Sequence, residues 1–132
     1  MQITKQIDKQ TLVDLIVTAL EGGSNYWYML GDQYIFPASV DETLCLTERI
    51  GHTLYDDERW GLPVYDVEYE GDYYEDLGGA LGIVTNASCQ KAFEIMSTDY
   101  PDVLGRIFEE QYDALDADIF FQLAVMGEVV YG

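Results

Sequence analysis

Residues 21–30 (EGGSNYWYML) constrain the fold of this chain more than any other stretch. Before them, Asp8 is a good helix N-cap, and apolar residues recur at helical spacing from position 12 to position 20. Gly22 and Gly23 end that pattern in the way that glycine commonly ends a helix. The aromatic and apolar residues that follow, from Asn25 on, have no helical gap and are typical of a strand. The sequence therefore predicts a helix that leads directly into a strand.

Further strands are predicted from apolar or alternating segments between turn residues. Residues 25–30 and 33–36, on either side of a Gly31-Asp32 turn, predict a hairpin. Other strand-like segments are a weak one over 1–7, one over 64–69, one over 77–85 with a bulge or close backbone approach near Gly78 and Gly79, and a closing strand over 128–132.

Four more helices are predicted from capping residues and apolar periodicity. They start after a capping box at Ser39 and end between positions 50 and 55, run from Asn86 to about 97, begin at Pro101, and extend over 117–126 between Asp116 and Gly127. Together the elements predict a single α+β domain, with about four to five helices packed on one side of a small, mostly antiparallel sheet.

The length and composition agree with such a domain. A chain of 132 residues with 48% hydrophobic content can bury a core without disulfide or metal staples. Cys45 and Cys89 lie in apolar, helix-like patterns, so we expect both to be buried free thiols. Because no secretion signal and no run of eighteen apolar residues occurs, we expect a cytoplasmic protein without a membrane contact.

The chain is strongly acidic, with 25 Asp and Glu against six Lys and Arg and a formal net charge of −19. Self-repulsion from such a charge opposes compactness, and the charge favours either simple solubility or a basic partner. Nine carboxylates, interleaved with tyrosines, lie between positions 55 and 76: Asp56, Asp57, Glu58, Asp66, Glu68, Glu70, Asp72, Glu75 and Asp76.

These nine carboxylates are the candidate partner-binding residues. Strand alternation places Asp66 and Glu68 together on a water-facing side, opposite Tyr65, Val67 and Tyr69. Duplex DNA carries one negative charge per about 1.7 Å, and proteins grip it with Lys and Arg, so an acidic face can compete for such a basic surface. The alternative is that the charges only solvate the surface.

The sequence predicts no catalytic residues, no metal site and no cofactor. His52 is the only histidine, and neither cysteine lies in a catalytic or zinc-binding motif. The acids from Asp66 onward resemble half of a calcium loop, but the twelfth position is Leu77, where such a loop needs Glu. Phosphate-binding glycine motifs are absent from the sequence.

A second hypothesis is that the chain sequesters a nucleotide signal. The candidate ligand-binding residues are Gly22, Gly23, Ser24, Asn25, Tyr26, Trp27 and Tyr28. Their aromatic rings would stack on a base, in a pocket that a homo-oligomer could complete. Against this, a helix C-terminus and the charge of the chain both disfavour phosphate, and aromatic residues at a strand start are more often core.

Two segments resemble those of a known group of proteins. They are ALEGGSNYWY at 19–28 and DADIFFQLAVMGEVVYG at 116–132, and they resemble short proteins encoded by bacteriophages, prophages and gut mobile elements. Residues 40–113 show no pattern fixed in that group. The resemblance implies an accessory protein inside a bacterial host cell and brings no established activity or catalytic residue.

Small acidic phage proteins often resemble inhibitors of host defence. The leading expectation is therefore a non-enzymatic inhibitor of a host defence or nucleic-acid-binding complex. Its partner would be a basic host protein or ribonucleoprotein, contacted through an acidic, nucleic-acid-mimicking face without direct binding to nucleic acid.

Overall fold

The first helix begins at the predicted cap. Asp8 accepts a 2.8 Å hydrogen bond from the amide of Thr11 and so opens α1 (Lys9–Thr18). The helix then widens into a π-helical turn, η1 (Ala19–Gly23), before the chain enters β1 (Tyr28–Leu30). This confirms the predicted order of helix, glycine pair and strand. The computed structural model describes residues 7–30, 35–70 and 79–132.

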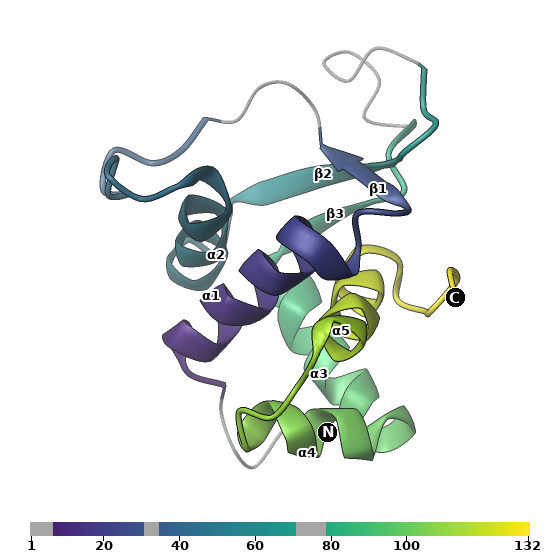
Figure 1. Ribbon diagram of the computed structural model, residues 1–132. Helices are drawn as coiled ribbons and strands as arrows, with labels where there is room; N and C mark the ends of the chain where they lie inside the picture. The colour runs from purple at the N-terminus through teal and green to yellow at the C-terminus, as the bar shows by residue number, and fades with distance from the viewer. Residues whose placement is uncertain (1–6, 31–34, 71–78) are drawn as a thin grey trace.

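In the described part of the chain, three antiparallel strands form a sheet in the order β1-β2-β3, as Figure 1 shows. The central strand is β2 (Gly61–Asp66), which pairs on one side with β1 and on the other with β3 (Gly82–Thr85). Leu62 lies opposite Val84, and both are buried, as is Val64. This side of the sheet faces the hydrophobic core.

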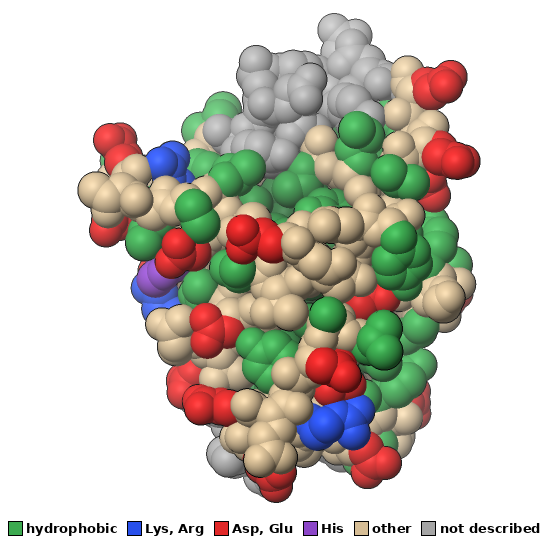
Figure 2. Space-filling view, in the orientation of Figure 1, with side chains coloured by type: hydrophobic (Ala, Val, Ile, Leu, Met, Phe, Trp, Pro, Cys, Tyr) green, Lys and Arg blue, Asp and Glu red, His purple; other side chains and the backbone are tan. Residues whose placement is uncertain are grey.

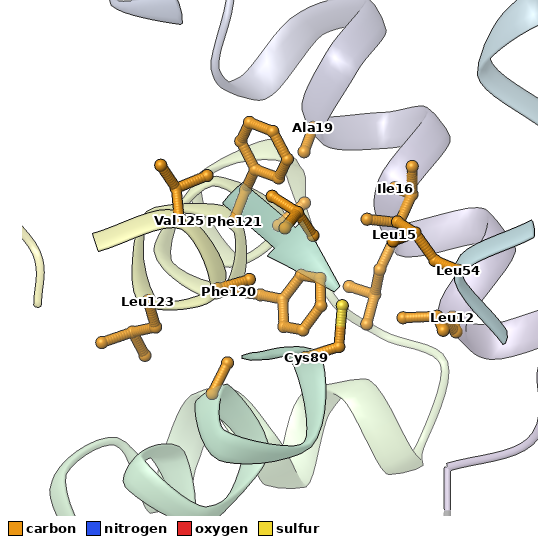
Figure 3. Close-up of a cluster of buried hydrophobic side chains, with 14 of the residues drawn as sticks. Leu12, Leu15, Ile16, Ala19, Leu54, Cys89, Phe120, Phe121, Leu123 and Val125 are labelled. Atoms are coloured by element: carbon orange, nitrogen blue, oxygen red, sulfur yellow. The ribbon is translucent and has the colours of Figure 1, made fainter. Parts of the chain in front are cut away.

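The remaining helices are α2 (Leu46–Asp56), α3 (Asn86–Asp99), α4 (Pro101–Phe108) and α5 (Ala114–Met126). The most buried of the described helices is α5, which packs against α3, α1, η1 and β3. Figure 3 shows Phe120 and Phe121 of α5 in one cluster with side chains of α1 and with Cys89 of α3. The predicted α+β class, with helices against a small antiparallel sheet, is confirmed.

The hairpin prediction is wrong, because the strand that pairs with β1 is not the predicted one. The strand that pairs with β1 is β2, and Ile35 and Phe36 belong to no strand, while residues 31–34 lie outside the described part. Phe36 instead stacks on Trp60, with ring centroids 5.5 Å apart. Stacking therefore gives Phe36 its apolar contact without strand pairing.

Turn chemistry also ends β2 earlier than the sequence alternation predicts. Asp66 accepts a 2.8 Å hydrogen bond from the amide of Glu68, and the amide of Tyr69 donates to the carbonyl of Asp66. Tyr65 is buried whereas Val67 is 43% exposed, so the predicted division into two faces over 64–69 is wrong.

Two further strands were predicted around the glycines and at the C-terminus. The described part of the 77–85 segment has its strand only from Gly82, and Gly79 approaches the ring of Tyr69 closely, as predicted. The tail over 128–132 forms no strand, because a side chain of α5 takes its backbone hydrogen bonds. The predicted weak strand over 1–7 and Gly78 fall wholly or mainly outside the described residues.

The second predicted helix starts too early. Asp41 accepts hydrogen bonds from the amide and hydroxyl of Thr43 and forms a turn, and α2 begins only after Cys45, its N-cap. Cys45 is therefore exposed, contrary to expectation, whereas Cys89 is buried as predicted.

The later helices are confirmed, with caps shifted along the sequence. The N-cap of α3 is Thr85, which shares a capping box with Ser88, and the N-cap of α5 is Asp113, which shares one with Asp116. Pro101 begins α4, and Gly127 ends α5 at φ +77°. No helix in the described ranges combines the length and apolar content that a bilayer crossing requires.

We expect Gly82→Ala to destabilise the fold. A Cβ at this position would lie 1.9 Å from the carbonyl oxygen of Val125, so the contact between β3 and α5 would have to open. The expected loss in free energy of unfolding is about 2 kcal/mol, measured by urea denaturation. The matched control is Gly105→Ala in α4, where a Cβ would have no heavy atom within 4 Å. This control should gain about 0.5–1 kcal/mol, and equal effects of the two changes would contradict the prediction.

Candidate functional site

A buried carboxylate, that of Asp118 on α5, is the centre of the polar interior. Its Oδ1 accepts hydrogen bonds of 2.7 Å from both the Ser24 hydroxyl and the Trp27 indole Nε1. Its Oδ2 accepts 2.6 Å from the Tyr26 hydroxyl and 3.0 Å from Nε2 of Gln122. A buried charge is costly unless hydrogen bonds replace its hydration, and four donors do so here.

The widened turn η1 places these donors. The amide of Ser24 donates to the carbonyl of Ala19, five residues back, and this closes the π-helical turn. Gly23 fits against the carbonyl of Ala114, since a Cβ there would lie 2.4 Å from its oxygen. Gly23 therefore lets the end of η1 approach the start of α5, and the next residues turn Ser24 and Trp27 inward.

Gln122, one helical turn after Asp118, holds the C-terminal tail. Its Oε1 accepts 2.9 Å hydrogen bonds from the amides of Val130 and Tyr131, and its Nε2 donates 3.0 Å to the carbonyl of Tyr131. The side-chain amide thus replaces the strand partner that the tail lacks. We name the set of Ser24, Tyr26, Trp27, Asp118, Gln122 and Tyr131 the Asp118 network.

Tyr131 links this network to the sheet. Its ring stacks on Trp27, with centroids 5.1 Å apart and an angle of 12°, and its hydroxyl donates 2.9 Å to Oδ2 of Asp66. Burial, and then the hydrogen bond to Asp66, raise the pKa of Tyr131 above its usual value. Burial, and then the hydrogen bond to Asp118, raise the pKa of Tyr26 to about 12. Both hydroxyls therefore remain proton donors near neutral pH.

The candidate ligand-binding residues thus have mostly internal contacts. Ser24 and Trp27 are buried, and the Tyr28 hydroxyl donates to the carbonyl of Leu20. Tyr26 is 52% exposed, but its hydroxyl is engaged with Asp118. Gly22 and Asn25 are exposed, and Gly23 is half-buried. This arrangement fixes the connector in place and offers a ligand few unused polar atoms.

A cavity of about 450 Å³ lies elsewhere, between α1 and the start of α5. Asp14, Glu110 and Asp113 line it together with Thr11, Thr18, Tyr112 and Ala114. Three carboxylates around one cavity repel the phosphates of a nucleotide. The cavity therefore gives no support to the nucleotide hypothesis.

The candidate partner-binding acids form two groups at opposite ends of β2. We name Asp56, Asp57 and Glu58 the entry group, and Asp66, Glu68 and Glu70 the exit group. The strand between them spans about 17 Å, at about 3.3 Å per residue. Asp72, Glu75 and Asp76 lie outside the described residues. Figure 2 shows acidic side chains scattered over the face in view, with hydrophobic side chains between them.

The members of the two groups differ in exposure and contacts. Glu58, Glu68 and Glu70 are exposed. Asp56 forms a 2.6 Å ion pair with Lys9, Asp57 accepts a 2.9 Å hydrogen bond from the amide of Arg59, and Asp66 is held by Tyr131. Each group therefore contains at least one carboxylate that faces water and at least one that shapes the fold.

Asp118 and Gln122 are key residues that are absent from the candidate residues predicted from the sequence. Their signal was available, because they are polar residues four apart in the long apolar run of the last helix. Asp116 is predicted as a cap but also binds Arg106, whose Nε and guanidinium NH₂ donate hydrogen bonds of 2.7 Å and 2.8 Å to its two oxygens.

His52, the histidine of the chain, lies half-buried on α2. Within the described ranges, no group of three or more His, Cys, Asp or Glu side chains is placed to hold a metal ion.

We expect Asp118→Asn to destabilise the protein strongly. The amide keeps the shape but replaces one acceptor oxygen with a donor, which would face groups that already donate. A loss of about 3 kcal/mol in free energy of unfolding is expected, since hydrogen bonds to buried charged groups contribute about 1.5–3 kcal/mol each. Asp99→Asn, at an exposed helix end, is the matched control and should change stability by less than about 0.5 kcal/mol. Similar losses in both variants would contradict the role of Asp118.

The Arg106–Asp116 pair should add acid-sensitive stability. The hydrogen bonds from Arg106 hold the pKa of Asp116 below its usual value of 3.8. The pair therefore contributes its full stabilisation when the pH is above the pKa of Asp116 in the unfolded chain. This stabilisation is lost as the pH falls through the lower pKa that Asp116 has in the folded protein. In urea denaturation from pH 7 down to about pH 3, the advantage of the native chain over Arg106→Gln should persist to about pH 5 and then shrink. An advantage independent of pH would contradict this assignment.

Comparisons of the chain with protein-family models, with curated proteins and with solved structures found no match.

Proposed function

We propose that this protein is a non-enzymatic binding protein whose acidic surface engages a basic protein. The observation that supports this proposal most is the net negative charge, because the chain has 25 Asp and Glu residues and only six Lys and Arg residues. A field of this size attracts basic partners and speeds their association.

Several of the cations are already occupied within the fold. Lys9 and Arg106 form ion pairs with Asp56 and Asp116, and Arg49 donates to the backbone carbonyls of Glu42 and Leu44. The exposed members of the entry and exit groups therefore retain a strongly negative environment. The two ends of β2 are the surfaces that we assign to the partner.

The partner in this proposal is a basic host protein or ribonucleoprotein that belongs to a defence or nucleic-acid-binding complex. Its Lys and Arg residues would meet carboxylates in place of phosphates, so this protein would compete with nucleic acid. Support comes from the charge and from the resemblance of the terminal segments to phage and prophage proteins. The contacts of Ser24 and Trp27 with Asp118 favour this function over nucleotide sequestration, since those side chains are turned inward.

We expect neutralisation of the exposed acids beside β2 to weaken partner capture. The variant Glu58→Gln/Glu68→Gln/Glu70→Gln removes three charges without removing a described hydrogen bond. Immobilised native chain should capture basic proteins from a bacterial lysate at about 50 mM salt, lose them at about 300 mM, and release them when duplex DNA is added. The amount of each protein captured by the triple variant should be lower by a factor of about ten or more.

The control for net charge is Asp99→Asn/Glu109→Gln/Glu128→Gln, which removes three exposed acids that belong to neither the entry group nor the exit group. It should capture nearly as much as the native chain. Equal losses in both variants would mean that the whole-chain charge acts without a specific surface. Capture that resists salt and DNA in all three proteins would overturn the proposed function.

A further inference from the structure

We propose that Tyr131 is a positioning residue for the partner surface, because its hydroxyl holds the turn that presents Glu68 and Glu70. We name residues 66–70 the exit turn. This inference rests on the proposed function and deepens it in two ways. It selects the exit turn as the part of the surface that meets the Lys and Arg of the partner, and it makes the placement of those contacts depend on the tail.

The exit turn differs in charge from the turn that precedes β2. Lys9 and Arg59 offset part of the charge of the entry group. The sequence has no Lys or Arg between Arg59 and Lys91, and the ion pairs found in the described ranges do not involve the exit turn. Glu68 and Glu70 are both exposed. The exit turn therefore offers a cationic partner carboxylates that form no ion pair within the described part of the chain.

Tyr131 acts on the exit turn through Asp66. The hydroxyl of Tyr131 donates 2.9 Å to Oδ2 of Asp66, and Oδ1 of the same carboxylate accepts 2.8 Å from the amide of Glu68. Asp66 is half-buried and uses each of its oxygens within the fold. The hydroxyl therefore fixes the carboxylate that in turn fixes the backbone of Glu68.

Further contacts hold the exit turn on both sides of Glu68. The amide of Val67 donates 2.9 Å to the carbonyl of Trp27. The ring of Tyr69 stacks on Tyr65, with centroids 5.0 Å apart. A carboxylate on a fixed backbone loses less conformational entropy when it binds a cation. A hydroxyl that completes this fixation therefore adds affinity without contacting the partner.

The variant Tyr131→Phe tests this inference without a change in charge. The phenyl ring can keep the stack on Trp27, and the backbone can keep its hydrogen bonds with Gln122, so the hydroxyl is what is lost. The probe is a fluorescent oligoarginine peptide, whose binding is followed by anisotropy at about 50 mM salt. Tyr131→Phe should bind it at least about threefold more weakly than the native chain, while thermal unfolding remains cooperative.

A double-mutant cycle separates positioning from a general loosening of the fold. Glu68→Gln/Glu70→Gln should lower the affinity for the peptide about tenfold. Adding Tyr131→Phe to it should lower the affinity by less than about 1.5-fold more, because the positioned charges are gone. Tyr26→Phe is the matched control, since it removes a hydroxyl that donates to Asp118 in the same network. This control should bind the peptide as tightly as the native chain.

Three results would overturn the inference: native affinity in Tyr131→Phe, an equal loss in Tyr26→Phe, or a loss from Tyr131→Phe that persists once the two charges are gone. In each case the proposed function stands if the double charge variant still binds more weakly than Glu109→Gln/Glu128→Gln, which removes the same charge from exposed positions elsewhere. Equal binding by these two double variants would instead remove the proposed function and this inference with it.

Discussion

The buried carboxylate of Asp118 is the interaction on which the rest of the structure depends. It joins α5 to Ser24, Tyr26 and Trp27, which precede it by more than 90 residues in the sequence. Through Gln122 it also orders the tail, and through Tyr131 it reaches the end of β2. Because an unpaired buried charge is expensive, the connector from Ser24 to Trp27 must be in place for this carboxylate to be satisfied, and the tail and the sheet are joined to the same network through Gln122 and Tyr131.

This arrangement brings distant parts of the chain together. Residues 19–28 and 116–132 meet at the Asp118 network. The acids at the ends of β2 come from the intervening sequence, and one of them, Asp66, accepts a hydrogen bond from Tyr131 of this network. The contacts that hold the tail therefore also hold part of the surface that we assign to the partner.

The sequence predicted the features that local chemistry decides. Asp8, Pro101 and Gly127 mark helix ends because their preferences act within a few residues. Contacts between distant segments decide the features that were predicted wrongly. The partner of β1 is β2, and the backbone of the tail hydrogen-bonds to Gln122 in place of a strand. The inward turn of Trp27 and the split of the acids into two groups also follow from tertiary contacts. Periodicity has no information on which polar residue in α5 collects donors from distant segments.

Native-state hydrogen exchange tests the central claim most directly. Gln122 accepts hydrogen bonds from the amides of Val130 and Tyr131, and Asp118 accepts one from the indole N–H of Trp27. If the Asp118 network is one cooperative unit, these three protons should exchange with a free energy close to that of global unfolding, together with the core amides of α5. Fast exchange of the tail amides, while the α5 core stays protected, would contradict the account.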